Sequence, residues 1–284
     1  LKNVGSSPTQ SRSNLLGLVG LSTMVVIVVT GANIGCGYEC VRQLSAVSEV
    51  TKVVITARSK EKGKATLSKL VNDTGKDRSF FDFQLLDLGD VSSIKAAIDA
   101  FPAFDRLCLN AGGGGTGKMH ASGNGITDSM VINTIGNAML IDGLIAVGKV
   151  PAGSRIVWVG SEVARNLLSF TGIAPQYCGN FKEKDIDWAI GKDYDGCCSC
   201  IPIRRQMGDY KNAKIIGHMH FAHLAKEHPE IHVISVSPGA VGGSATDRAH
   251  CPVKQLMRCI PCAFYIMGAT HACLPSASTK LGSK

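Results

Sequence analysis

Two short groups of residues, far apart in the chain, have the types and spacing to do chemistry. The first is the stretch Thr30-Gly31-Ala32-Asn33-Ile34-Gly35-Cys36-Gly37, which follows an apolar run and precedes a helical pattern. Glycines at this spacing let a ligand approach the backbone, and the N–H groups at the start of a helix favour a pyrophosphate. The spacing differs from the Gly-x-Gly-x-x-Gly pattern of other dinucleotide-binding folds, and simple turn geometry is the alternative explanation.

The second group is Tyr210 and Lys214, four residues apart and therefore on one face of a predicted helix. A charge about 4 Å from a phenolate is worth about 4 kcal/mol at an effective dielectric constant near 20. We therefore expect the pKa of Tyr210 to fall from about 10 towards about 7, the range of a physiological acid-base catalyst. This pair is common in ordinary amphipathic helices, but together with the glycine-rich turn it predicts an enzyme that transfers hydride.

Arg58 bears on which dinucleotide would bind. It ends the second predicted strand, at the place where an acidic residue would bind the ribose 2′-hydroxyl group. A guanidinium group there would bind a 2′-phosphate instead. The sequence therefore favours NADP(H) over NAD(H), with an ordinary surface charge as the alternative.

The elements that must position these residues alternate between strands and helices. Strands are expected over residues 24–29, 52–57, 81–86, 106–109, 155–159 and 232–236. Helices are expected over residues 38–47, 61–71, 91–100, 128–147 and 210–226. This order predicts an α/β fold with a Rossmann-type, doubly wound parallel sheet, whose ligands bind beyond the carboxyl ends of the strands.

The chain of 284 residues, 45% of them hydrophobic, is long enough for one full core. We expect residues 1–23 to be an N-terminal extension and residues 24–284 to form one NADP-binding catalytic domain. Residues 166–209 show only a weak hydrophobic periodicity, and the segment is too short and polar to have a core of its own. We therefore predict that it is an insert that lies over the site. The chain stops about where a last strand should begin, and we expect that strand to be missing.

The net charge of +8 comes from scattered Lys and Arg residues rather than from one basic block. This argues against nucleic-acid binding and for a basic surface that attracts a phosphorylated cofactor. The eleven cysteines include a cluster at Cys197, Cys198 and Cys200 and a Cys-x-x-Cys at Cys259 and Cys262. A structural zinc site would want two such pairs, so no metal is predicted.

Cys36 and Cys108 fall in predicted strand and turn elements, where free cysteine acts as a small apolar filler, and this usage suits a reducing, intracellular compartment. Before Glu39 there is no acidic residue, and several serines accompany Lys2 and Arg12. That composition is typical of an organelle transit segment, with a disordered basic tail as an equal alternative. Residues 15–29 are apolar but shorter than the roughly 20 residues of a membrane helix.

Further motifs appear in a fixed order around these two groups. They are Asp87-Leu88, Leu109-Asn110-Ala111-Gly112, Asn133 within Val131-Ile132-Asn133-Thr134, Ser161 after Trp158-Val159-Gly160, and Pro238-Gly239. With the glycine-rich turn and the Tyr-x-x-x-Lys pair, they make the chain resemble a short-chain dehydrogenase/reductase from about Met24 to at least Gly243.

The resemblance implies a role for each matched residue. Tyr210 would donate the proton, Lys214 would hold the nicotinamide ribose and tune the phenol, Ser161 would orient the substrate oxygen, and Asn133 would hold a water behind Lys214. NADPH would supply the hydride. The cofactor-binding residues would be Thr30, Gly31, Asn33, Ile34, Gly35, Gly37, Arg58, Asp87, Leu88, Asn110, Ala111, Gly112, Tyr210, Lys214, Pro238 and Gly239.

The spacing of 49 residues between Ser161 and Tyr210 departs from the usual short gap of the family. Light-dependent protochlorophyllide reductases are similar in this long insert, in a Val-Gly-Ser motif and in the Tyr210-Lys211 start. Retinol-dehydrogenase-like members are the other near relatives.

These features predict an NADPH-dependent reductase for a bulky, apolar small-molecule substrate with a carbonyl group or a conjugated C=C bond. A plastid enzyme resembling protochlorophyllide reductase is one alternative, with the cytoplasm as the other location. A non-catalytic scaffold subunit of a membrane-bound assembly is a second alternative, docked through residues 15–21 and the cysteine-rich insert. The family resemblance also implies a homo-oligomer, and a peripheral contact with a membrane is left open.

Overall fold

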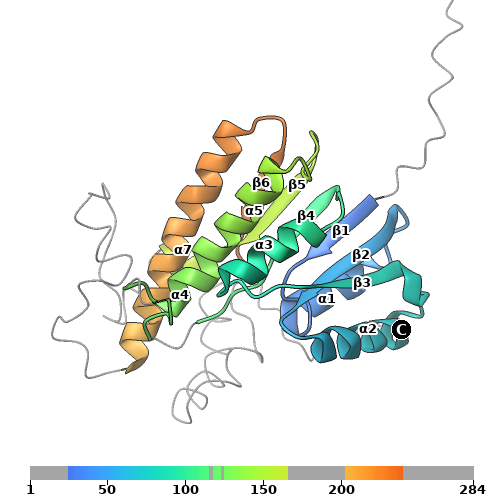
Figure 1. Cartoon of the computed structure of the whole chain (residues 1–284), viewed down its shortest axis with the longest axis horizontal. Coiled ribbons are helices and arrows are strands. Elements are labelled where there is room, and N and C mark those ends of the chain that lie inside the picture. Colours follow the sequence, from blue (N-terminus) through green and yellow to red (C-terminus); the bar gives the residue numbers. More distant parts are fainter. Residues whose placement is uncertain (1–24, 115–117, 123–124, 166–201, 239–284) are drawn as a thin grey trace, which may run out of the picture.

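The structure is a computed structural model of the chain and describes residues 25–114, 118–122, 125–165 and 202–238 (Figure 1). Outside these residues lie the N-terminal extension, the cysteine-rich part of the expected insert, and residues 239–284, which include Gly239 and the Cys259–Cys262 pair.

The described residues form one parallel sheet of six strands in the order β3-β2-β1-β4-β5-β6. The strands are β1 Val25–Val29, β2 Val50–Ala57, β3 Phe81–Leu85, β4 Arg106–Leu109, β5 Arg155–Val159 and β6 His232–Val236. The order reverses direction between β1 and β4, so the predicted doubly wound α/β fold is confirmed. The carboxyl ends of β1 and β4 therefore meet at the switch point where such sheets bind ligands.

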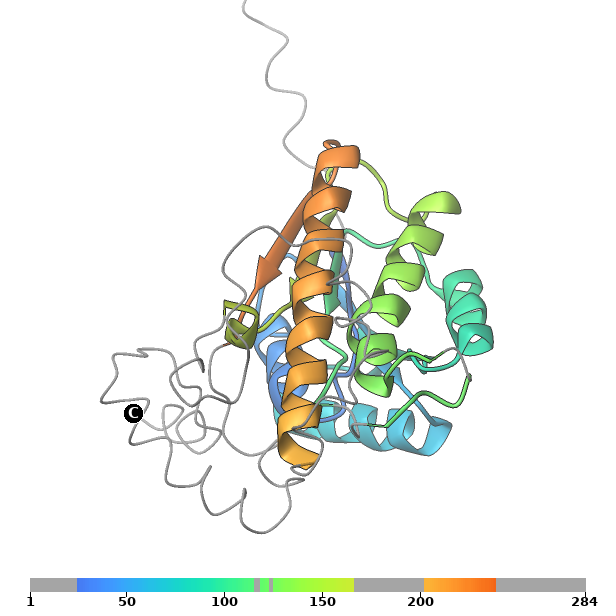
Figure 2. The same cartoon turned by 90° about the vertical axis from the view of Figure 1, so that its left-hand side faces the viewer.

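Helices cover both faces of the sheet (Figures 1 and 2). They are α1 Gly35–Leu44, α2 Lys60–Thr74, α3 Val91–Ala100, α4 Asp128–Met130, α5 Gly136–Ala146 and α7 Pro202–Glu227, with the short turns η1 Arg78–Phe80, η2 Val131–Ile135 and η3 Glu162–Arg165. Figure 2 shows α3, α5 and α7 side by side on one face, while α1 and α2 lie on the other.

Two apolar clusters hold these layers together. In β1, Val28 belongs to the cluster under α3, α5 and α7, whereas Ile27 and Val29 belong to the cluster under α1 and α2. Because successive side chains of a strand point to opposite faces, a strand covered on both sides must be apolar throughout. This explains the continuous run of valine and isoleucine before the glycine-rich turn.

Two helix starts differ from the sequence prediction by three residues or more. Helix α1 begins at Gly35 rather than at residue 38, because the last glycines of the turn already form the first helical turn. Helix α7 begins at Pro202, so the last eight residues of the expected insert are helical. Proline suits the first position of a helix, and Ile203, Arg204 and Gln206 are compatible with a helix. The prediction missed this start because the glycines and cysteines nearby obscure the helical spacing of apolar residues.

The helical segment Asp128–Ala146 is, among the described residues, the one long and apolar enough by length and composition to span a membrane. Half of its most apolar window is buried in the fold. Leu140, Ile141 and Leu144 belong to the core cluster beneath α5, so packing against the sheet accounts for its apolar character.

Two glycines of α5 provide a matched test of this packing. A Cβ atom at Gly136 would collide with the backbone carbonyl of Leu88, whereas at Gly143 it would meet only the end of the Ile98 side chain. Alanine favours a helix by up to about 1 kcal/mol over glycine. We expect Gly143→Ala to stay within about 1 kcal/mol of the parent in free energy of unfolding, and Gly136→Ala to lose about 2 kcal/mol or more, since backbone cannot rotate away. Urea denaturation of both variants checks this, and equal effects would contradict the packing described.

Candidate active site

The glycine-rich turn connects β1 to α1 and is fixed to β4. The Thr30 backbone N–H donates to the carbonyl of Cys108 over 2.9 Å, and the Thr30 Oγ1 accepts the N–H of Ala111 over 2.9 Å. Gly31 has a φ of 66°, and a Cβ atom there would lie 2.8 Å from the Cα of Ala111. Both the backbone conformation and the close approach therefore require glycine at position 31.

Asn110 completes the attachment of the turn. Its Nδ2 donates to the carbonyls of Thr30 and Gly31 over 3.0 and 3.2 Å. Gly37 packs so closely against this amide that a Cβ atom would overlap it. On the other side, the Gly31 N–H donates to the Thr56 Oγ1 at the end of β2 over 3.2 Å.

The start of α1 fits an anionic ligand. Its N-cap is Ile34, in extended conformation, and no side chain caps the helix by a hydrogen bond. Ile34 and Gly35 are exposed, and Asn33 is half-buried beside them. Since the first N–H groups of a helix have no partner within the helix, this end can bind the pyrophosphate of a dinucleotide without displacing a side chain.

The residues expected to contact the adenosine part lie at the ends of the next two strands. Arg58 follows β2 and is exposed, two residues after Thr56, which bonds to the turn. Asp87 follows β3, and its Oδ1 accepts the N–H of Gly89 over 2.9 Å, while Leu88 is buried. Their strands are paired in parallel, which brings Arg58 and Asp87 to the same edge of the sheet.

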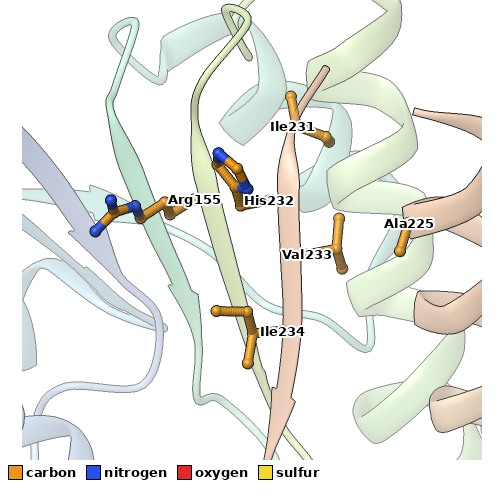
Figure 3. A pocket seen from close by; sticks show the side chains of 6 residues that line it. All are labelled: Arg155, Ala225, Ile231, His232, Val233 and Ile234. Atoms are coloured by element: carbon orange, nitrogen blue, oxygen red, sulfur yellow. The ribbon is translucent and has the colours of Figure 1, made fainter. Parts of the chain in front are cut away.

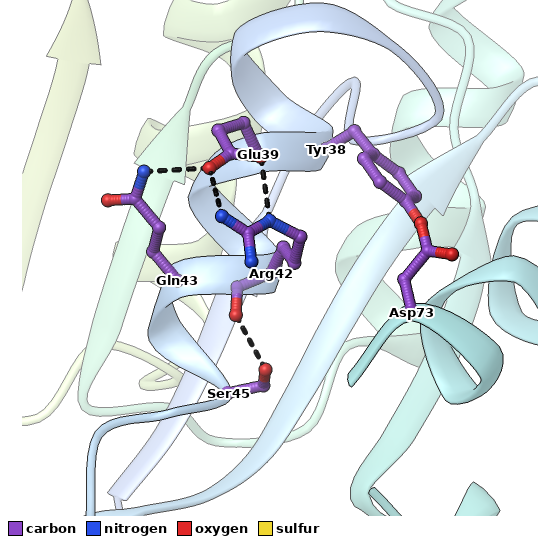
Figure 4. A network of polar contacts seen from close by, with 6 residues as sticks. All are labelled: Tyr38, Glu39, Arg42, Gln43, Ser45 and Asp73. Carbon is purple, nitrogen blue, oxygen red and sulfur yellow. Dashed lines mark hydrogen bonds and ion pairs between the residues drawn. The ribbon is translucent and has the colours of Figure 1, made fainter. Parts of the chain in front are cut away.

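A network on α1 holds this helix from its outer side (Figure 4). The Tyr38 hydroxyl donates to Asp73 of α2 over 2.6 Å. Arg42 pairs with Glu39 one turn earlier, with a shortest distance of 2.6 Å. The Tyr38 bond links the helix that starts at the turn to its neighbour, so the position of α1 is set from both sides.

Lys214 is buried on α7 and points at the end of β5. Its Nζ donates to the carbonyl of Val159 over 2.7 Å and lies 4.8 Å from the centre of the Trp158 ring. Trp158 is fully buried, and a Cβ atom at Gly217 would overlap its indole ring. The glycine therefore lets α7 approach the sheet closely enough for Lys214 to reach the strand end. Burial lowers the pKa of Lys214 to about 8.

Tyr210 lies beside Lys214, as expected, with 5.6 Å between the Lys214 Nζ and the centre of the phenol ring. The expected fall of the phenol pKa is wrong for the protein alone. Burial raises the pKa of Tyr210, and a hydrogen bond with Ser161 opposes this only in part. The sequence argument counted the attraction of the ammonium group but not the cost of removing a phenolate from water.

Asn133 lies in η2, a π-helical turn, and is fully buried. Its Nδ2 donates to the carbonyls of Gly113 and Ser129 over 2.7 and 2.9 Å, and its Oδ1 accepts the N–H of Gly113 over 3.1 Å. A Cβ atom at Gly112 would lie 2.6 Å from the Asn133 Oδ1 and 3.6 Å from the Lys214 Nζ. The asparagine thus fixes the loop after β4 next to the lysine.

The structure therefore brings most of the expected residues together. The contacts above join the glycine-rich turn to residues 110–112, and these to Asn133, Lys214 and Tyr210. Ser161 is hydrogen-bonded to Tyr210. Pro238 is half-buried just after β6, and Gly239 lies outside the described residues.

Sequence reasoning missed three supporting residues. Trp158 and Gly217 set the distance between α7 and β5, and the Thr134 hydroxyl donates to the carbonyl of Ala213, next to Lys214. The position of Trp158 two residues before the Gly-Ser pair, and that of Gly217 three after Lys214, are the signals that would have identified two of them.

A hollow elsewhere on the surface is not part of this site. It is lined by Arg155, Ala225, Ile231, His232, Val233 and Ile234 (Figure 3). Arg155 and His232 are the first residues of β5 and β6, so the hollow lies at the amino ends of these strands, opposite the glycine-rich turn.

Comparison with known proteins gives the family. The model of the short chain dehydrogenase family matches residues 25–173, more than half of the chain. This range contains the turn, Asn133 and Ser161. The chain therefore belongs to the short-chain dehydrogenase/reductase family of oxidoreductases.

Its relatives have several named activities. The chain is 29% identical to (+)-neomenthol dehydrogenase of Arabidopsis thaliana over 75% of this chain and 82% of that protein. It is 31% identical to human retinol dehydrogenase 12 over 48% of this chain and 43% of that protein. The predicted likeness to retinol dehydrogenases is thus confirmed. The chain also spans less than half the length of several other curated relatives.

The fold is likewise that of solved family members. A short-chain dehydrogenase from Sphingobium yanoikuyae, in complex with NADPH, superposes with a TM-score of 0.54 over 88% of this chain and 87% of that one, at 18% identity.

The low pKa of buried Lys214 predicts a pH-dependent stability. Its pKa is about 8 in the fold and about 10.5 when the chain is unfolded, so between these values the unfolded state binds more protons. Stability linked to this residue should therefore rise as the pH rises from 8 to 10.5. We expect the free energy of unfolding of the parent, relative to Lys214→Met, to increase by about 2 kcal/mol between pH 7 and pH 10 in urea titrations.

Lys226→Met is the matched control, because Lys226 is exposed on the same helix. It should show no such difference from the parent. A parent and a Lys214→Met variant with parallel pH dependence would rule out a buried, desolvated lysine.

Proposed function

We propose that this protein is an NADP(H)-dependent oxidoreductase that reduces a bulky, apolar substrate at a carbonyl group or a conjugated C=C bond. One observation carries the proposal. Ser161, Tyr210 and Lys214 converge at the end of β5, next to the loop that fixes the glycine-rich turn. A proton donor and a dinucleotide cradle then share one end of the sheet.

The residues of the cradle fit the cofactor. The uncapped start of α1 would hold the pyrophosphate, Arg58 the 2′-phosphate, and Asp87 and Leu88 the adenine. Residues 110–112, Lys214 and the Pro238-Gly239 segment would lie towards the nicotinamide ribose. Bound NADPH supplies the hydride. In this proposal residues 24–284 form one NADP-binding domain.

Tyr210 would act as the proton donor. Its raised pKa keeps the phenol protonated at neutral pH, which suits reduction, where the substrate oxygen takes up a proton. Ser161, bonded to the phenol, would orient that oxygen. As the proton leaves, a negative charge develops on the phenol, and the ammonium form of Lys214 would stabilise it.

The relatives guide the choice of substrate. Two of them are named for neomenthol and retinol, both largely apolar alcohols. Protochlorophyllide remains an alternative because of the long spacing between Ser161 and Tyr210. Homo-oligomerisation, a contact with a membrane and a plastid or cytoplasmic location stay predictions from the sequence.

Replacing Tyr210 tests the catalytic role. Tyr210→Phe removes the transferable proton but keeps the ring, so we expect turnover to fall at least about 100-fold while NADPH binding is kept. Turnover is measured with neomenthol and retinol plus NADP⁺, and with protochlorophyllide plus NADPH in dark and light. Unchanged turnover would refute the role of the phenol, and a parent that binds NADPH but turns over no substrate would favour the scaffold alternative.

Replacing Arg58 tests the cofactor preference. Arg58→Asp should weaken NADPH binding by about ten-fold to 100-fold and leave NADH binding nearly unchanged, because only NADPH carries the 2′-phosphate. Lys95→Asp, an exposed position on α3 with the same change of charge, should leave the ratio of the two affinities unaltered. Equal losses for both cofactors in Arg58→Asp would contradict the assignment.

A further inference from the structure

His218 lies on α7 one helical turn after Lys214 and is not among the residues assigned to the reaction so far. Residues four apart on a helix share a face, so His218 faces the sheet as Lys214 does. Its imidazole Nδ1 is 2.9 Å from the Ser235 Oγ of β6, and the two atoms form a hydrogen bond. This bond ties α7 directly to β6, the strand next to β5.

The imidazole also packs against β5. It meets the Trp158 ring edge to face, with 5.0 Å between the ring centres and an angle of 90° between the rings. This arrangement is favourable for two ring systems and holds both in one orientation. The centre of the same indole ring lies 4.8 Å from the Lys214 Nζ, so His218 supports the surface on which the lysine rests.

The third contact of the imidazole is with Gly160, directly after β5. Side chains two residues apart on a strand share a face, so position 160 faces α7 as Trp158 does. A Cβ atom at Gly160 would lie 2.6 Å from both the Cε1 and the Nε2 of His218, and 3.2 Å from the Ser235 Oγ. The imidazole therefore occupies the space that a side chain at position 160 would fill.

These contacts fix the residue that follows. The Gly160 N–H donates to the carbonyl of Val236 over 2.7 Å, so β6 holds Gly160 through the backbone while His218 packs on its Cα. Ser161 comes next and is hydrogen-bonded to Tyr210, two turns before His218 on the same helix. The position of α7 along the strands therefore sets the distance between the serine and the phenol.

We propose that His218 is a positioning residue for the reaction, whose bond to Ser235 and contact with Gly160 hold Ser161 against Tyr210. This inference rests on the proposed function, because Ser161 is the residue that would orient the substrate oxygen there. The glycine-rich turn is held by other side chains, on β2 and after β4. His218 should therefore govern turnover and leave binding of the dinucleotide nearly unchanged.

Stability measurements test the contact with Gly160 without any cofactor. A methyl group at position 160 must displace the imidazole, so Gly160→Ala should lower the urea midpoint of the parent. In the His218→Ala background the space is open, and the same substitution should lower the midpoint by less than about half as much. Equal losses in both backgrounds would overturn the placement of His218.

A second set of variants tests the positioning of the serine, again in the protein alone. Ser161→Ala and Tyr210→Phe should shift the urea midpoint non-additively in the parent, because each removes one partner of the same hydrogen bond. In His218→Leu, which keeps much of the bulk but loses the bond to Ser235, the two shifts should become additive. A coupling that persists in His218→Leu would refute the positioning role.

Kinetics with the substrates used for Tyr210→Phe test the consequence for turnover. His218→Leu should lower kcat at least about ten-fold and keep the substrate KM and the NADPH dissociation constant within about two-fold of the parent. His218→Asn should recover most of this loss, because its amide can replace the imidazole Nδ1 in the bond to Ser235. His223→Leu, on an exposed position of the same helix, is the matched control and should behave as the parent.

The outcomes separate this role from the proposed function. A kcat of His218→Leu equal to that of the parent would contradict the positioning role, and so would a loss in which NADPH binding falls as much as kcat. A parent that turns over no substrate, while His218→Leu loses the coupling between Ser161 and Tyr210, would instead refute the proposed function and leave the placement by His218 supported.

Discussion

The amide of Asn110 holds the site together, because it joins the end of β4 to the two backbone carbonyls that open the glycine-rich turn. At this point of a doubly wound sheet, the connections that follow the two neighbouring strands run to opposite faces of the sheet and leave a crevice between them. A side chain that bonds across the crevice fixes the two connections to each other. Asn110 does so from one side and Thr56 from the other, so the turn has little freedom. The direction of α1, and with it the direction of its first N–H groups, follows from this attachment.

The other half of the site is governed by burial. Trp158 and Gly217 bring α7 against β5, and the lysine that reaches the strand end there loses most of its contact with water. The same exclusion of water shifts the pKa values of Lys214 and Tyr210 in opposite directions, each towards the neutral form. At neutral pH the protein alone thus holds a neutral phenol beside a lysine that is still mostly protonated, and burial makes the charge of that lysine easier to lose.

The sequence predicted the fold well where elements are short and sharply bounded. Strands β4, β5 and β6 and helix α3 have the predicted bounds, since polar residues, glycine or proline stand at or next to their ends. The start of α7 could not be read, because residues 202–209 show no clear period. The order of the site motifs was readable from residue types, but the role of Trp158 as the surface under Lys214 was not. It depends on how closely a helix approaches a strand, which only packing decides.

The π-helical turn at Val131–Ile135 has a consequence for the whole helix that follows it. Such a turn holds one residue more than the α-helical repeat, and each residue of an α-helix advances the chain by about 100° around its axis. The turn absorbs that extra residue, and Leu140, Ile141 and Leu144 of the following α5 all belong to the core cluster. Loss of one residue inside the turn would therefore be absorbed by a return to the α-helical repeat. Loss of one residue within α5 itself would instead turn the residues after it by about 100° and take them away from the sheet.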